Sequence, residues 1–383
     1  MEAWPSPRPS SGDVPVVRGW TAAPDGRHHG AHYAEAARTL DARSESFLDF
    51  SANINPLGAP TAALAAGAEA LHGAAGRYPD LHYPELCAAL AFYLKVSPKT
   101  VLPTNGGAEA LFLAARAAVE RTVRSKALIL EPTFSEYAVA TRAAGLEAVR
   151  VVARRPETGF CLDLAILDEA LKASSDVGLV FLCNPNNPTG DAISHEEALW
   201  VADRVREAGA VLVVDEAFAD FAPRLSIAPE VDQALFVARS FTKFFAVPGL
   251  RLGCLVAHDP EHVRAFQPSW SVNAVAAAAG IAASKEEAFA RATLEEVALR
   301  RRELFSALKG LPGITAYPSA ANFLLVYGPP GLPERLARRG ILVRGCEPFR
   351  GLGPGFFRVA VRRKQENERL VQTLRDILSE EAP

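Results

Sequence analysis

The sequence has few cysteines and no pattern among them. Only five occur in 383 residues, and they are widely scattered. No two have the spacing of a zinc site or a redox motif, so a disulfide framework and a metal site are both disfavoured. We expect five reduced thiols, as is typical of a cytoplasmic protein, and no bound metal.

Long hydrophobic runs are also absent. No apolar stretch reaches the roughly 20 residues that a membrane-spanning helix needs. Residues 1–15 (MEAWPSPRPSSGDVP) lack the apolar segment of a signal peptide. Their proline and serine content predicts a disordered extension over residues 1–25. We expect no contact with a membrane and a cytoplasmic location.

An excess of positive charge is missing too. The formal net charge is -3 at pH 7, which argues against a nucleic-acid-binding surface but leaves room for a local basic pocket. The hydrophobic content of 49% and charged content of 22% are those of a soluble globular protein. The length predicts two closely packed domains.

Hydrophobic runs and alanine-rich helical stretches alternate between about residues 84 and 256. The runs 127–130, 177–183 and 211–215 are continuously hydrophobic, as in parallel strands buried on both faces. Segments 135–144 and 195–208 have helical spacing. This alternation predicts a doubly wound, mostly parallel α/β sheet.

The pattern changes after Trp270. A helix-prone stretch over 272–308 precedes a Pro-Gly break, and strands are predicted at 321–326 and 356–361 before a last helix over 364–378. These elements predict a smaller α+β domain. We assign residues 76–270 to the large domain, and residues 26–75 with 271–383 to the small domain.

Segment 240–253 (SFTKFFAVPGLRLG) places Lys243 among phenylalanines. A lysine that bonds to an aldehyde must lose its proton, which a desolvated setting favours. Ser240, Thr242 and Arg251 offer donors for a phosphate. Taken alone, such a lysine is more typical of a surface residue whose stem lies on apolar neighbours.

Polar residues follow the predicted strands. Asp215 ends the run 211–215, and segment 183–190 (CNPNNPTG) ends another. Ligands of α/β sheets bind at such strand ends. A carboxylate there could pair with the protonated pyridine nitrogen of a bound cofactor, and an Asn amide could donate to a phenolate oxygen of the same ring. The alternatives are a helix N-cap for Asp215 and a bare turn for the asparagines.

Two further segments carry weaker signals. Segment 104–111 (TNGGAEAL) opens a helix with a glycine pair, whose backbone N–H groups could bind a phosphate. Segment 131–137 (EPTFSEY) places Phe134 where it could stack on a flat ring, although such aromatics more often pack in a core.

Together and in this order, these segments resemble the class I and II aminotransferase family of pyridoxal 5′-phosphate (PLP) enzymes, from about Phe50 to the C-terminus. The resemblance implies PLP-dependent transferase fold type I, with PLP bound by the large domain and held by Lys243 as a Schiff base. The other positions that match cofactor-binding residues are Gly107, Ala108, Phe134, Asn187, Asp215, Ser240, Arg251 and Tyr78. Tyr78 matches a residue that reaches into the neighbouring subunit, which implies a homodimer with shared active sites.

One position departs from the family pattern. Most members have tyrosine three residues after the strand aspartate, and this chain has Phe218. The missing hydroxyl predicts a more basic ring oxygen on the cofactor and makes transamination less favoured.

Within the family, segments 48–58 (LDFSANINPLG), 270–273 (WSVN), 342–346 (LVRGC) and 349–352 (FRGL) resemble the decarboxylases of cobalamin biosynthesis that act on L-threonine O-3-phosphate. The products would be CO₂ and (R)-1-amino-2-propanol O-2-phosphate. The implied substrate-binding residues are His29, Gly30, Asn53, Arg344 and Arg358. Arg358 would bind the carboxylate and Arg344 the phosphate, with help from His29 and Asn53. Alternatively, His29 is a solvated tail residue and Arg344 a surface arginine.

Two other functions compete with this reading. A histidinol-phosphate aminotransferase, or an aminotransferase of a related phosphorylated amino compound, would share the fold and the cofactor motifs. A non-enzymatic PLP-binding regulator would add an N-terminal DNA-binding unit, for which the short proline-rich extension is unsuited.

Overall fold

The computed structural model describes residues 47–74 and 76–380. The expected disordered extension over residues 1–25, with His29 and Gly30, lies outside the described residues. Among those that are described, no helix is long and apolar enough to cross a membrane. All five cysteines are free.

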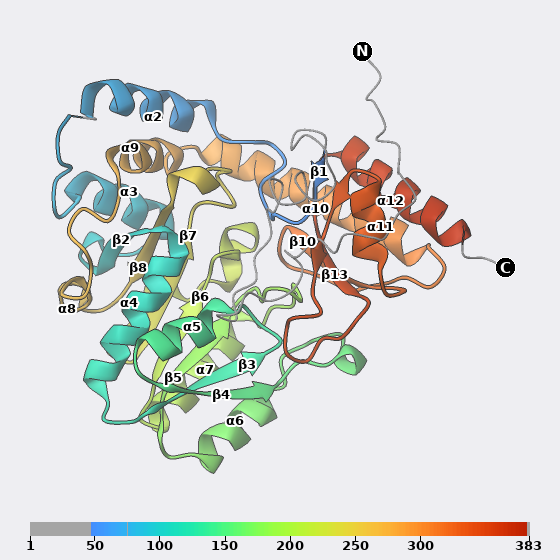
Figure 1. The fold of residues 1–383 in the computed structure, drawn as a ribbon. Helices are drawn as coiled ribbons and strands as arrows, with labels where there is room; N and C mark the ends of the chain where they lie inside the picture. The colour runs from blue at the N-terminus through green and yellow to red at the C-terminus, as the bar shows by residue number, and fades with distance from the viewer. Residues whose placement is uncertain (1–46, 75, 381–383) are drawn as a thin grey trace.

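A seven-stranded sheet forms the centre of the larger unit, with the strand order β2-β8-β7-β6-β5-β3-β4 (Figure 1). The strands are β2 (Val101–Asn105), β3 (Lys126–Glu131), β4 (Glu147–Val152), β5 (Val177–Cys183), β6 (Val211–Asp215), β7 (Leu235–Ser240) and β8 (Leu252–Val256). Only β8 runs antiparallel to its neighbours. The predicted doubly wound, mostly parallel sheet is confirmed.

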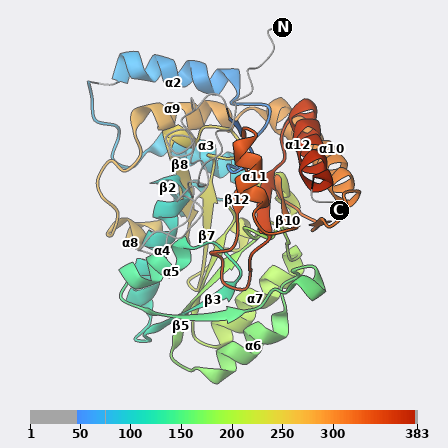
Figure 2. The same cartoon turned by 45° about the vertical axis from the view of Figure 1, so that its right-hand side comes forward.

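Helices cover both faces of this sheet, because its strands are hydrophobic on both sides (Figures 1 and 2). In β5, Leu179 and Phe181 face one core, and Val180 and Leu182 face the other. The first face is covered by α4 (Gly106–Arg121), α5 (Glu136–Ala143) and α8 (Pro260–Arg264). The second is covered by α3 (Pro84–Leu94), α6 (Leu164–Ala173), α7 (His195–Glu207) and α9 (Ala274–Ala283).

The smaller unit is an antiparallel sheet packed against helices. Its strand order is β12-β13-β10-β9, built from β9 (Thr315–Ala316), β10 (Phe323–Tyr327), β12 (Arg344–Gly345) and β13 (Phe356–Ala360). The short strands β1 (Leu48–Asp49) and β11 (Ile341–Leu342) pair in parallel beside it. Its core also includes residues of α11 (Leu332–Arg338) and α12 (Lys364–Ser379). These elements match the predicted α+β arrangement.

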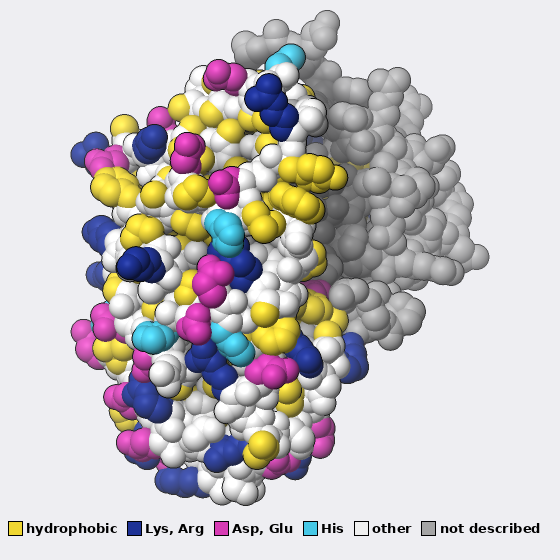
Figure 3. All heavy atoms as spheres, turned by 90° about the vertical axis from the view of Figure 1, so that its left-hand side faces the viewer, with side chains coloured by type: hydrophobic (Ala, Val, Ile, Leu, Met, Phe, Trp, Pro, Cys, Tyr) yellow, Lys and Arg dark blue, Asp and Glu magenta, His cyan; other side chains and the backbone are white. Residues whose placement is uncertain are grey.

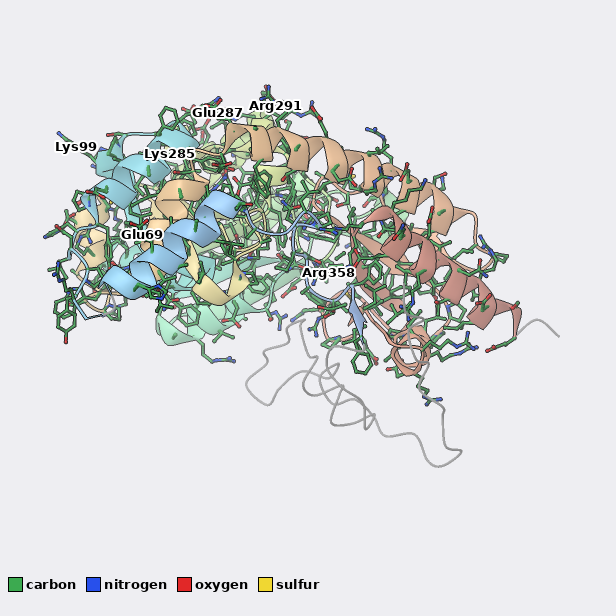
Figure 4. All side chains as sticks on the ribbon, turned by 90° about the horizontal axis from the view of Figure 1, so that it is seen from above. Glu69, Lys99, Lys285, Glu287, Arg291 and Arg358 are labelled. Carbon is green, nitrogen blue, oxygen red and sulfur yellow. The ribbon has the colours of Figure 1, made fainter. Side chains whose placement is uncertain are left out.

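Three helices from the segments assigned to the small domain also pack against the large sheet. Helices α2 (Thr61–Ala74) and α9 contribute Ala63 and Ala276 to the core of the large sheet, and α10 (Glu287–Lys309) contributes Val297. Further along, α10 contributes Leu304 to the core of the small unit. Helix α10 therefore belongs to both units, and Figure 4 shows it running from one to the other.

The helix predicted over 272–308 is two helices. Residues 284–286 separate α9 from α10, and the Ser284 hydroxyl donates to the Ile281 carbonyl over 3.0 Å. Because the flanking residues are strong helix formers, the sequence pattern does not mark this break.

Candidate active site

A cavity of about 660 Å³ lies where the two units meet, at the carboxyl ends of the parallel strands. Residues from β5, β6 and β7 and the turns after them form one side, and Arg344 and Arg358 of the small unit form another. Figure 4 shows Arg358 between the two units. The chain segment Ser51–Ile54 completes the wall. Of the predicted site residues, those lining the cavity are Asn53, Gly107, Ala108, Phe134, Asn187, Asp215, Ser240, Lys243, Arg251, Arg344 and Arg358.

Lys243 lies in the turn that follows β7. Its Nζ donates to Ser240 Oγ over 3.1 Å and lies 5.4 Å from the centre of the Phe218 ring. Burial lowers the pKa of Lys243 below its ordinary value, although the charge of Asp215 opposes this effect. A lysine in this setting loses its proton more readily, as a nucleophilic amine must.

Asp215 is the last residue of β6, opposite Cys183 of β5. Its Oδ1 accepts a hydrogen bond from the Ala217 amide over 2.9 Å, and its Oδ2 accepts one from Tyr137 Oη over 2.8 Å. Burial raises the pKa of Asp215, while the charge of Lys243 and the Tyr137 hydrogen bond oppose the rise. A cationic partner in the cavity would favour the ionised carboxylate.

The start of α4 lies against β7 and β8. A methyl group on Gly107 would lie 3.0 Å from Ser240 Cβ, and one on Gly106 would lie 2.7 Å from a guanidinium nitrogen of Arg251. Gly106 has a φ of +76°, which glycine adopts without strain. The glycines thus let the N-terminal backbone of a 16-residue helix approach Ser240 and Arg251, an arrangement that suits a phosphate.

Asn187, Phe134 and Phe218 line the same cavity. Asn187 lies in the turn after β5, and its Oδ1 accepts a hydrogen bond from Arg358. Phe134 lies after β3, edge-on to Tyr137 with ring centres 5.8 Å apart. Phe218 is buried and packs edge-on against Phe323 at 5.0 Å.

Two buried arginines face the cavity from adjacent strands. Arg344 of β12 and Arg358 of β13 are cross-strand partners in an antiparallel pair. Burial lowers the pKa of each to about 10, and the neighbouring positive charge of Arg344 contributes to the lowering at Arg358. Arg358 donates to the neutral oxygens of Asn187 and of the Ser51 carbonyl, the latter over 2.8 Å. Two adjacent buried cations favour a ligand with more than one negative charge.

Tyr78 is the described site residue that lies outside this cavity. It is 80% exposed and stacks on Trp270 with ring centres 4.5 Å apart. Its proposed contact is with another subunit, so its place in one protomer does not test that prediction.

The sequence patterns missed the contribution of Tyr137 and Ser51. Tyr137 lies in the first turn of α5, and its hydroxyl donates to Asp215. The Ser51 carbonyl has no recognisable pattern. The Thr242 hydroxyl, named with Ser240 as a possible phosphate donor, lies 2.9 Å from Ser240 Oγ. Over the described part of the chain, no group of three or more potential ligands is arranged for a metal ion.

Comparison with known proteins gives consistent matches over nearly the whole chain. The family described as aminotransferase class I and II matches residues 45–374. Threonine-phosphate decarboxylase of Salmonella typhimurium is 39% identical over 364 residues, which cover 93% of this chain and 98% of that protein. Histidinol-phosphate aminotransferase of Methanopyrus kandleri is 32% identical and covers 90% of this chain and 91% of that protein. The crystal structure of L-threonine-O-3-phosphate decarboxylase from Porphyromonas gingivalis superposes with a TM-score of 0.75 at 25% identity, covering 87% of this chain and 99% of that one.

Proposed function

The chain belongs to the class I and II aminotransferase family, and on that premise we propose that it is a PLP-dependent decarboxylase of L-threonine O-3-phosphate. The observation that carries the substrate class is the cross-strand pair Arg344 and Arg358, which face one cavity together with Lys243. The identity to a threonine-phosphate decarboxylase over 93% of the chain supports the reaction.

The donor set of the cavity fits PLP. Backbone groups of Gly107 and Ala108, with Ser240 and Arg251, would hold its phosphate. Asp215 is a buried carboxylate whose pKa is raised by its burial, and it would pair with the ring nitrogen. Asn187 would meet the ring oxygen, and Phe134 would cover a ring face.

Bound PLP would supply an aldehyde that bonds to amino groups and a ring that accepts electrons. Lys243 provides the amine, which lies near the Phe218 ring, and its burial lowers the pKa, so that it loses its proton more readily. Asp215, whose carboxylate accepts a hydrogen bond from Tyr137, would stabilise a positive charge on the ring nitrogen, which makes the ring a better electron acceptor.

The substrate carries a carboxylate, an amine and a phosphate. Arg358 would bind the carboxylate through its planar fork, and Arg344 the phosphate, with Asn53 and the segment around His29 and Gly30 assisting. With both ends held, rotation about the α-carbon is restricted, and the orientation of the carboxylate decides which bond breaks. In the proposed reaction CO₂ would leave the α-carbon while the electron pair of the broken bond is accepted by the ring, and Lys243 would return a proton to the α-carbon.

We infer a homodimer in which Tyr78 reaches the cofactor phosphate of the partner subunit. Tyr78 and Trp270 form an exposed aromatic pair, and Leu64 and Leu71 of α2 are more than half exposed. Figure 3 shows the side of the molecule that carries α2, α3 and α8, with hydrophobic side chains interspersed among charged ones. An exposed set of large apolar side chains favours a protein contact. The five free cysteines support a cytoplasmic location.

The deciding experiment supplies purified, PLP-loaded protein with L-threonine O-3-phosphate and no 2-oxo acid, and measures CO₂. Release over many turnovers is the expected result. If no CO₂ is released, and if the protein transfers the amino group of histidinol phosphate once 2-oxoglutarate is added, the proposed decarboxylase is wrong. The protein would then be an aminotransferase of the same fold.

A further inference from the structure

Asn55 is buried next to the chain that carries Lys243, and its side chain is not part of the cavity wall. Its backbone amide donates to the Lys243 carbonyl over 3.0 Å. Its Nδ2 donates to the Phe244 carbonyl over 2.7 Å and to Thr293 Oγ1 over 2.9 Å. One residue thus holds two consecutive carbonyls of the lysine turn and ties them to α10.

The orientation of the Asn55 amide is determined by its surroundings. Its Oδ1 accepts a hydrogen bond from the Leu57 amide over 3.0 Å. The NH₂ group must therefore point at Phe244 and Thr293, both of which offer an oxygen acceptor. With donors and acceptor all engaged and only 3% of the residue exposed, the amide has little freedom to move.

The same segment also contacts the arginine proposed to bind the substrate carboxylate. The Ser51 carbonyl accepts a hydrogen bond from Arg358 over 2.8 Å, and the Asn53 carbonyl accepts one from Asn322 over 3.0 Å. Residues 51–54 line the cavity, and Asn55 follows directly. A five-residue segment therefore connects Arg358 to the backbone of Lys243.

We propose that Asn55 is a positioning residue for Lys243, and that segment 51–55 links the position of Arg358 to that of the lysine. The inference rests on the proposed role of Lys243 as the residue that bonds to PLP. Side-chain placement within a fraction of an ångström matters for such an amine, and displacement by about 1 Å costs roughly 10²-fold in rate.

The test replaces Asn55 by leucine, which has a similar shape and no hydrogen-bonding groups. Asn367→Leu is the matched control: Asn367 is also buried and also bonds backbone groups, those of Arg362, but lies in the small unit away from the cavity. Asn55→Ser retains a hydroxyl donor and serves if the leucine variant does not fold. All proteins are stripped of PLP and then reloaded.

Three quantities are measured: the rate of PLP uptake by visible absorbance, the pH midpoint of the visible band of the loaded protein, and kcat and KM. For Asn55→Leu we expect slower uptake, a shifted midpoint, and a kcat that falls roughly 10²-fold while KM changes much less. Asn55→Ser should lie between. Asn367→Leu should lower the melting temperature and leave the midpoint unchanged.

An Asn55 variant that loses melting temperature but keeps the wild-type midpoint and uptake rate would overturn the proposal, because the residue would then be merely structural. The absorbance readouts need only PLP and Lys243. If the wild-type protein releases no CO₂ from L-threonine O-3-phosphate, the proposed reaction fails, and the midpoints still decide the role of Asn55.

Discussion

Tyr137 donates its phenolic hydrogen to Oδ2 of Asp215 over 2.8 Å. The side chain of Tyr137 is fully buried, so its hydroxyl has no contact with solvent. Its ring stacks on Phe181 with centres 5.0 Å apart and nearly parallel planes, which fixes the direction of the hydroxyl. Burial and the neighbouring Asp215 charge raise the pKa of Tyr137 well above its ordinary value, so it remains a donor throughout the working pH range.

Tyr137→Phe should therefore remove the hydrogen bond to Asp215, while the phenyl ring still fills the space beside the carboxylate. A hydrogen bond to a charged group contributes about 1.5–3 kcal/mol, so we expect kcat/KM to fall roughly 10- to 100-fold. Tyr93→Phe is the control, since Tyr93 Oη donates to the buried Asp220 over 3.0 Å away from the cavity. Equal losses of activity in both variants would contradict a specific role for Tyr137.

The proposed roles of Arg344 and Arg358 can be distinguished with two ligands, each of which carries only one of the two anionic groups. O-phosphoethanolamine has the phosphate without the carboxylate, and L-threonine has the carboxylate without the phosphate. We expect Arg344→Leu to weaken inhibition by the first and Arg358→Leu to weaken inhibition by the second, each by roughly tenfold or more. Inhibition constants measured at constant ionic strength test the pattern, and the reverse pattern would exchange the two assignments.

Asp215 should lower the stability of the cofactor-free protein at neutral pH. Its pKa is raised in the folded state, so the unfolded chain releases this proton first as the pH rises above 3.8. Stability is then lost between that value and the higher folded-state pKa. Asp215→Asn, which cannot ionise, should raise the melting temperature of the cofactor-free protein at pH 7, and the gain should shrink as the pH falls through this window.

This prediction is checked by thermal unfolding of both proteins at several pH values. The same variant should lose most of its activity, because an amide does not stabilise a cation on the cofactor ring. A stability difference that is constant with pH would show that the raised pKa of Asp215 is not its cause.

Arg239 should be essential for folding rather than for chemistry. It is buried between Glu216 and Asp220, with ion pairs to both carboxylates. Arg239→Met would leave two buried acids without their cation, so we expect a loss of roughly 3–5 kcal/mol of unfolding free energy. Arg206→Met removes a comparable pair of contacts, to Asp203 and Asp232, from the surface and should cost about 1 kcal/mol or less. Urea unfolding curves give both values.

Gly253 should be needed for PLP retention. A methyl group there would lie 2.5 Å from the Gly106 carbonyl carbon and 2.7 Å from the Gly107 amide nitrogen, so the backbone that approaches the phosphate would have to shift. We expect Gly253→Ala to release PLP on dialysis, as measured by visible absorbance. Gly249→Ala is the control, since a methyl group there meets nothing within 4 Å.

Much of the large sheet could be predicted because its strands are buried on both faces. The predicted runs 177–183 and 211–215 coincide with β5 and β6. Continuously hydrophobic runs of this length are typical of strands that are buried on both faces. The site residues at the strand ends were predictable for the same reason: Asp215 and Asn187 follow strands whose carboxyl ends share one edge.

Residues that act through tertiary hydrogen bonds could not be predicted in this way. Asn55 and Lys243 are 188 positions apart, and their contact depends on how one segment crosses another. The register that pairs Arg344 with Arg358 likewise follows from the path of the single connection 346–355 between β12 and β13 rather than from a local pattern. The association of α2 with the large unit depends on α9, whose alanine-rich surface offers no sequence signal for a partner.

The cavity wall joins Ser51, near one end of the chain, to Arg358, near the other. During synthesis, the first of these leaves the ribosome long before the second exists. The residues proposed to hold PLP all lie at or before Arg251, so the large sheet and these residues can form while the substrate side of the cavity is still open. Truncation even a few dozen residues from the C-terminus should therefore yield a chain with a nearly complete sheet and no means of retaining a carboxylate.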